Sequence, residues 1–195
     1  MFGNTDAVRT VVQSHTQIRS VFSNPVVLEP LVLGDVERLL ANRYAALQLD
    51  PVRAWRSPVE SAVVQRLYEL FRGDLRGMLK ALEDGITDLL GLTSAGAEVA
   101  PVGLDDLQLT LRQRNQAELR EQLGDTAWKR LLAWARVDSA SIQTQAQLVE
   151  LWQVRQPTVS QTLQQMIEAG AVEALPRRGR EAIQYLMTGT ARLAL

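Results

Sequence analysis

The chain contains no cysteine and only one histidine among its 195 residues. Without cysteine, disulfides, thiolate nucleophiles and cysteine metal sites are excluded. The single histidine, His15, cannot build a metal cluster by itself. No apolar run approaches the length of a membrane span, and the N-terminus lacks the basic region and long apolar stretch of a signal peptide. We therefore expect a cytoplasmic protein with no membrane partner.

Lysine is also scarce, and its placement excludes a phosphate-binding loop. Such a loop needs Gly-Lys followed by Ser or Thr, whereas the two lysines, Lys80 and Lys129, follow Leu79 and Trp128. We expect that this chain alone does not bind or hydrolyse ATP. It is therefore predicted to have no cofactor, no metal and no catalytic residues, and not to be an enzyme.

The remaining composition is that of a globular protein, with 46% hydrophobic and 22% charged residues. The net charge of −1 is unevenly distributed. From Thr126 onward eight Lys and Arg outnumber five Asp and Glu, which gives +3 and leaves −4 for the first 125 residues. Three of these arginines, Arg177, Arg178 and Arg180, surround Gly179. Guanidinium groups gathered on one tip repel one another, so their placement favours an anionic partner.

Helical periodicity dominates the first two thirds of the chain. Apolar spacing predicts a helix over Asp35–Leu47, and Ser57 is expected to cap a second helix that runs through Phe71. Gly73-Asp74 is expected to end that helix and cap a third, which ends near Gly91. The segment 91–103 consists mainly of small residues and is nearly uncharged, and a helical region over 104–123 follows it. We interpret this stretch as a linker with a connecting helix, and expect the segments on either side to fold separately.

The last seventy residues carry a different order of signals. They predict a helix over 126–137, a short β-prone run over 141–143, helices over 144–152 and 157–169, a strand over 172–175, a tip over 176–180 and a strand over 182–186. This order resembles a winged helix-turn-helix domain of the kind found in MarR-like regulators. In such domains the second helix of the pair enters the DNA major groove and the hairpin wing lies beside a phosphate backbone.

Polar side chains on the predicted helix over 157–169 fit that resemblance. The apolar residues Val159, Leu163, Met166 and Ile167 recur at helical spacing and are expected to pack inward. Gln and Thr can form hydrogen bonds with base edges. The predicted interface with double-stranded DNA consists of Arg155, Thr158, Gln161, Thr162, Gln165, Arg177, Arg178 and Arg180.

The N-terminal two thirds resemble the second half of an AAA+ ATPase of the initiator or STAND-like kind. The segment "IRSVFSNPVVLEPL" is similar to the last core strand of that family, and "LGDVERLLANRY" to the start of its helical lid. Gly73-Asp74-Leu75-Arg76 matches the lid's Gly-[Asn/Asp]-x-Arg motif. The resemblance implies that Arg76 is a sensor-2 arginine and that Arg19 occupies the place of an inter-subunit finger. ATP and Mg²⁺ are implied only where a missing ATPase core is supplied.

Together these patterns predict a mainly α protein, in which a helical lid-like bundle precedes a winged helix-turn-helix with a small β-hairpin wing. The predicted parts are a core remnant over 1–33, a lid-like domain over 34–92, a linker and connecting helix over 93–124, and the winged helix over 125–195. The expected function is DNA binding and transcription regulation, by the C-terminal portion of an AAA+-type ATPase or by a regulator derived from one.

Two alternatives stay open. In the first, the winged helix is a protein-interaction or dimerisation module whose arginine tip meets an acidic surface on a partner, an ATPase or a second copy of the chain. The absence of Lys and Arg between Thr158 and Gln165 favours this alternative. In the second, the chain is a free-standing MarR-like regulator whose N-terminal helices dimerise.

The missing phosphate loop generates the first testable prediction. A clean preparation of the chain should release no inorganic phosphate from ATP above a buffer blank, because no residue pattern is present to hold the phosphates and the metal. A phosphate-release assay checks this. Turnover that disappears in an Arg76→Ala variant would overturn it.

Overall fold

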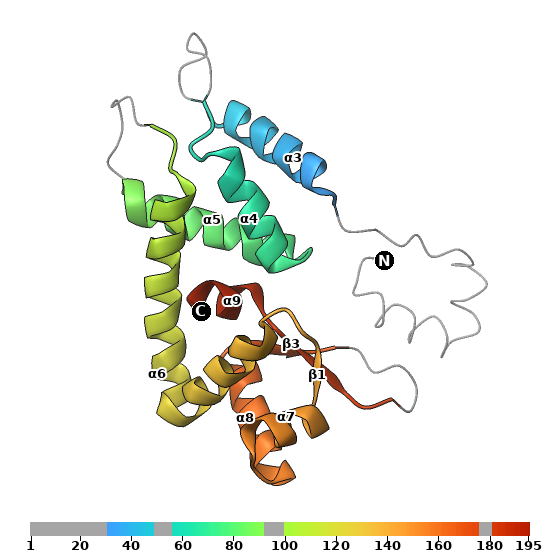
Figure 1. The fold of residues 1–195 in the computed structure, drawn as a ribbon. Coiled ribbons are helices and arrows are strands. Elements are labelled where there is room, and N and C mark those ends of the chain that lie inside the picture. Colours follow the sequence, from blue (N-terminus) through green and yellow to red (C-terminus); the bar gives the residue numbers. More distant parts are fainter. Residues whose placement is uncertain (1–30, 49–55, 92–99, 176–180) are drawn as a thin grey trace, which may run out of the picture. The chain divides into compact units, whose positions relative to one another are not determined.

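Residues 31–48, 56–91, 100–175 and 181–195 are described by the structure, a computed structural model. Val32–Leu195 form one compact unit. Within the described residues the fold is mainly helical, with one small antiparallel sheet of three strands (Figure 1). The expected core remnant over 1–33, with Arg19, lies almost wholly outside the described residues.

The helices and strands follow the predicted order closely. Their bounds are α3 Leu33–Ala46, α4 Ser61–Phe71, α5 Leu75–Leu90, α6 Leu104–Asp138, β1 Gln143–Thr144, α7 Gln145–Trp152, α8 Gln156–Glu168, β2 Val172–Ala174, β3 Gln184–Met187 and α9 Gly189–Ala194.

Helices α3, α4 and α5 and the first half of α6 share a core that we call the bundle cluster. Its buried side chains recur at the helical spacing that the sequence predicted, and they include Val63, Leu67, Met78, Leu107 and Leu111. As predicted, Asp74 caps α5, because its carboxylate accepts a hydrogen bond from the Gly77 N–H at 3.0 Å.

The expected cap at Ser57 is wrong. Helix α4 begins at Ser61, and the chain before it is extended. Val59 forms a parallel bridge with Val102, in which the Glu60 N–H donates to the Val102 carbonyl and the Val102 N–H donates to the Pro58 carbonyl. The Ser57 hydroxyl instead donates to the Val59 carbonyl at 2.6 Å. A partner more than forty residues away in sequence therefore takes backbone groups that local capping was expected to use.

Helix α6 changes direction at Gly124, which separates its two halves. Gly124 has φ +67° and ψ 169°, a conformation that interrupts the helix and that favours glycine. Arg120 and Asp125 form a salt bridge across this kink, with Nη2 and Oδ1 3.0 Å apart. The break at Gly124-Asp125 confirms the expected end of the connecting helix.

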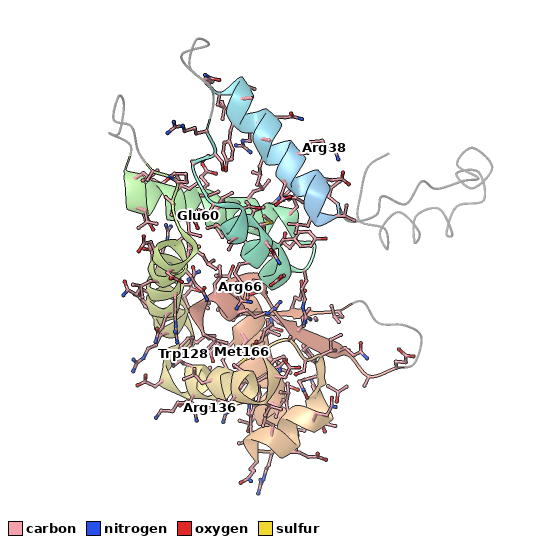
Figure 2. The ribbon with its side chains drawn as sticks, turned by 45° about the horizontal axis from the view of Figure 1, so that its top comes forward. Arg38, Glu60, Arg66, Trp128, Arg136 and Met166 are labelled. Carbon is pink, nitrogen blue, oxygen red and sulfur yellow. The ribbon has the colours of Figure 1, made fainter. Side chains whose placement is uncertain are left out.

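Helices α7 and α8, the sheet and the second half of α6 enclose a second core, which we call the sheet cluster. Leu119 and Leu123, at the end of the first half of α6, also belong to it. Figure 2 labels Trp128 of α6 and Met166 of α8, which are both buried in it. Strand β3 lies in the middle of the sheet, so the strand order is β1-β3-β2. Tyr185 and Met187 of β3 point into the core, and the alternate residue Gln184 is exposed. This alternation is typical of a sheet with one buried face.

Helix α9 was not predicted, and it contributes to both clusters. The Thr188 hydroxyl caps it by accepting from the Ala191 N–H. Ala191 and Ala194 belong to the sheet cluster, whereas Leu193 belongs to the bundle cluster. The Arg192 guanidinium donates to the Leu70 carbonyl at the end of α4. These contacts do not support the expectation that the segments flanking 93–124 fold separately.

The start of α9 packs so closely on α4 that only glycine fits there. An ideal Cβ on Gly189 would overlap the Phe71 ring, which is 6% exposed and cannot move into solvent without leaving the core. We predict that Gly189→Ala lowers the free energy of unfolding by about 1–3 kcal/mol, the usual cost of overpacking. Urea unfolding followed by tryptophan fluorescence measures this change.

Gly34→Ala is the matched control. A Cβ at Gly34 would meet no atom within 4 Å, and this residue lies in the first turn of α3. Its stability should stay unchanged or rise by up to about 1 kcal/mol, because alanine favours a helix more than glycine does. If both variants unfold at the wild-type urea concentration, the close packing of α9 on Phe71 is wrong.

Candidate nucleic-acid interface

Helix α8 presents one buried and one exposed face. Val159, Leu163 and Met166 are buried, as the sequence predicted. The exposed face is polar, carries no Lys or Arg, and consists of Gln156, Pro157, Ser160, Gln161, Gln164, Gln165 and Glu168. Gln156, Ser160 and Gln164 were not among the predicted interface residues, although their spacing of four residues places them on one side of a helix.

Thr162 is not on the exposed face, so its prediction as a DNA-binding residue is wrong. It is only 4% exposed. Its hydroxyl donates to the Thr158 carbonyl at 2.9 Å and accepts from the Arg130 guanidinium of α6. Thr162 is polar by type, but a partner 32 residues earlier satisfies its hydroxyl and allows burial.

Gln165 is exposed but already engaged within the protein. Its side-chain amide donates to the Leu123 carbonyl at 2.8 Å, next to the kink at Gly124. The kink deprives the last carbonyls of the preceding helical segment of their usual partners, and Gln165 satisfies one of them. Gln165 therefore supports the α6–α8 contact. By contrast, Gln161 is exposed and forms no hydrogen bond within the described residues.

Arg155 stands at the start of α8, in the extended conformation of an N-cap residue. Its carbonyl accepts hydrogen bonds from the Thr158 and Val159 N–H groups, and its side chain is exposed and forms no salt bridge within the described residues. Thr158 is half-buried one turn further on. Arg155, Thr158 and Gln161 thus occupy neighbouring turns of the same helix. The predicted wing arginines, Arg177, Arg178 and Arg180, lie outside the described residues.

Arg76, the predicted sensor-2 arginine, is exposed in the first turn of α5. No salt bridge or hydrogen bond fixes its guanidinium within the part of the chain that the structure describes. Neighbouring Asp74 is the cap of α5. The described residues also contain no group of three His, Asp or Glu side chains placed to hold a metal ion. None of the described helices is long and apolar enough to cross a membrane.

The exposed side chains around the N-terminal half of α8 are therefore the best candidate for an interface. They can form hydrogen bonds with base edges or with polar groups of a protein, and Arg155 adds one positive charge. No family model matches the chain, and neither the curated proteins nor the solved structures contain a match.

The different environments of two glutamines on α8 generate a stability prediction. Gln165→Ala should lower the free energy of unfolding by about 1 kcal/mol, because it leaves the Leu123 carbonyl without its partner. Gln161→Ala makes the same chemical change on the same helix and should alter stability by less than about 0.5 kcal/mol. Urea unfolding of the two variants checks this. Equal midpoints would show that Gln165 does not stabilise the kink.

Proposed function

We propose that 125–195 is a winged helix-turn-helix domain that binds double-stranded DNA. The observation that carries this proposal is the pairing of the strands. A short strand, β1, precedes the helix pair α7 and α8, a β2–β3 hairpin follows it, and β3 pairs with both β1 and β2. This is the arrangement expected of a winged helix, in which the hairpin stands beside the second helix of the pair.

The local sequence stabilises the two helices in a form suited to DNA contact. Thr144 and Gln147 form a capping box at the start of α7, which leaves this helix with satisfied N–H groups. The turn between α7 and α8 is only a few residues long and contains Gln153 in the left-handed conformation, with φ +52°. A short turn that fixes the angle between two helices is typical of helix-turn-helix motifs.

The exposed face of α8 supports recognition of bases by hydrogen bonds. Gln161 is free to donate and accept at once, which allows bidentate contact with an adenine. Arg155 at the helix start and the arginines at 177, 178 and 180 would supply the contacts with phosphates. Because phosphate contacts provide most of the affinity and base contacts most of the specificity, the two sets of residues should respond differently to mutation.

We also propose that 34–92 is an AAA+-type helical lid, on the resemblance carried by the Gly73–Arg76 motif. The described residues of this segment form helices α3, α4 and α5, and Arg76 stands exposed at the start of α5. We assign Arg76 no step in a reaction. A separate ATPase core would have to supply the phosphate and metal sites.

The DNA proposal is tested by the salt dependence of binding to a random duplex. If Arg177 and Arg178 each neutralise one phosphate, the double Ala variant should lower the slope of log K against log salt by about 2. Arg112→Ala is the control, because Arg112 is exposed on the first half of α6, away from the proposed interface. Its slope should equal that of the wild type. Fluorescence anisotropy with a labelled duplex at three salt concentrations suffices.

Specificity is tested with Gln161→Ala. On a duplex selected from a random pool, this variant should lose about 1–3 kcal/mol of binding free energy, and on random DNA it should lose little. The proposal fails if the wild type binds no duplex at moderate salt. That result would favour the protein-interaction alternative, with which the lack of basic residues on the exposed face of α8 also agrees.

A further inference from the structure

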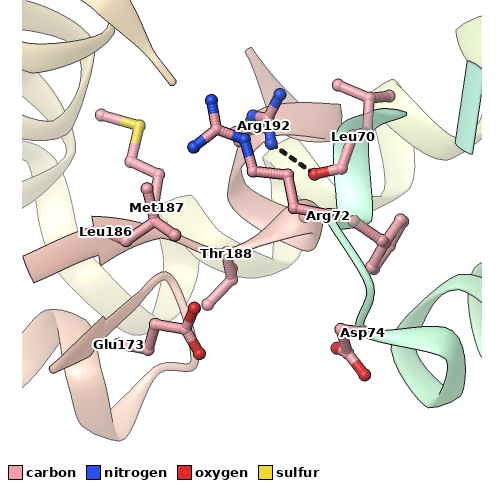
Figure 3. A pocket seen from close by; sticks show the side chains of 10 residues that line it. Leu70, Arg72, Asp74, Glu173, Leu186, Met187, Thr188 and Arg192 are labelled. Carbon is pink, nitrogen blue, oxygen red and sulfur yellow. Dashed lines mark hydrogen bonds between the residues drawn. The ribbon is translucent and has the colours of Figure 1, made fainter. Parts of the chain in front are cut away.

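A pocket of about 260 Å³ lies between the end of α4 and the strands β2 and β3 with α9 (Figure 3). Its walls include Phe71 and Arg72 from the α4–α5 junction, Glu173 from β2, Met187 from β3 and Arg192 from α9. No residue of α8 lines it. This pocket is therefore distinct from the candidate interface described above.

Two arginines, Arg72 and Arg192, form one side of the pocket. In Figure 3 the Arg72 side chain runs alongside Arg192, so that the two guanidinium groups are neighbours. Neither arginine forms a salt bridge within the described residues. Arg66 lies close enough to add a third positive charge, and its own partner, Glu69, is 3.8 Å away and exposed. Burial, with the charges of Arg72 and Arg66, lowers the pKa of Arg192 below its ordinary value, and the negative charge of Asp138 only partly opposes this change.

Arg192 also retains a buried donor that has no hydrogen-bond partner among the described residues. Its two terminal nitrogens point to the Leu70 and Glu69 carbonyls, but its Nε is buried without a hydrogen-bond partner. An orphan donor of this kind is rare in a folded protein and costs free energy. The two carboxylates of the pocket do not relieve it. Asp74 accepts from the Gly77 N–H, and Figure 3 draws Asp74 and Glu173 on the opposite side from the guanidinium groups.

We propose that the arginine side of this pocket binds a phosphate-type oxyanion, held between Arg72 and Arg192. The exposed Arg72 fork can donate to a tetrahedral oxyanion directly, whereas the buried Arg192 Nε can donate to it only after the side chains over it move aside. The charge of the anion would relieve the repulsion between the guanidinium groups. The pocket is smaller than the 300–1,000 Å³ typical of sites for drug-sized ligands. It therefore suits inorganic phosphate or a small phosphorylated molecule rather than a whole nucleotide.

A bound oxyanion would connect two parts of the fold. Arg72 follows α4 of the bundle cluster, and Arg192 belongs to α9, which continues from β3. Neutralising both would tighten the contact between the α4–α5 junction and the base of the β2–β3 hairpin. Phosphate chemistry has two sources here, a free molecule and the backbone of DNA. The site itself does not depend on the DNA proposal, because its test uses phosphate alone.

The test follows the Arg192 Nε–H signal by ¹⁵N NMR during a titration with inorganic phosphate, with chloride of matched ionic strength as the reference. The signal is assigned by its loss in Arg192→Lys. We expect a saturable shift in the wild type. Arg72→Asn should weaken the apparent affinity at least about tenfold by removing charge-assisted hydrogen bonds. Asn is chosen because it tolerates the left-handed conformation of Arg72, with φ +49°.

Two controls keep the outcome clear. Arg112→Asn removes an exposed arginine elsewhere on the molecule and should bind phosphate like the wild type. A short duplex in phosphate-free buffer separates the sources, because a shift with duplex alone assigns the oxyanion to the DNA backbone. A signal that responds to neither phosphate nor duplex, or equally to chloride, overturns the proposal. Loss of duplex affinity with the phosphate response intact would count against the DNA proposal only.

Discussion

The seating of the Phe71 ring against Gly189 is the contact on which the rest of the structure depends. The ring closes the end of α4 inside the bundle cluster, and the missing side chain at Gly189 allows α9 to approach it. From this point α9 places Leu193 in one core and Ala191 in the other. The two cores meet through small residues at close range. A single added methyl group at this contact would therefore disturb the packing of both cores.

Much of the fold could be predicted because its signals are local. Apolar residues at helical spacing defined α3, α5 and α8 to within a few residues, and Gly124 and Asp74 marked a break and a cap. The predicted strand over 182–186 likewise overlaps β3, which lies at Gln184–Met187. In each case the residues that determine the structure lie within one or two turns of one another, where periodicity and capping rules apply.

The predictions that were wrong or missing concern features that depend on a partner distant in sequence. Ser57 is of a residue type that caps helices, but the chain after it pairs with Val102 instead of starting a helix. Thr162 was assigned to the surface by its polarity, and Arg130 makes its burial possible. Helix α9 is six residues long, too short for a periodic signal, and is stabilised by what it packs against. Of the predicted interface residues, Arg155 and Gln161 are exposed, and their side chains form no hydrogen bond or salt bridge within the described residues. The pocket between α4 and α9 could not be predicted, because no local sequence pattern brings its residues together.

The hydrogen bond from Arg192 to Leu70 joins residues 122 positions apart. Bringing such distant segments together costs chain entropy before any contact compensates, and contacts of large sequence separation slow folding. If the helices of the bundle cluster form first from local interactions, one side of the Phe71 ring stays exposed to water until α9 packs on it. Exposed aromatic surface in a partly folded chain promotes association with other chains, so late docking of α9 would favour aggregation.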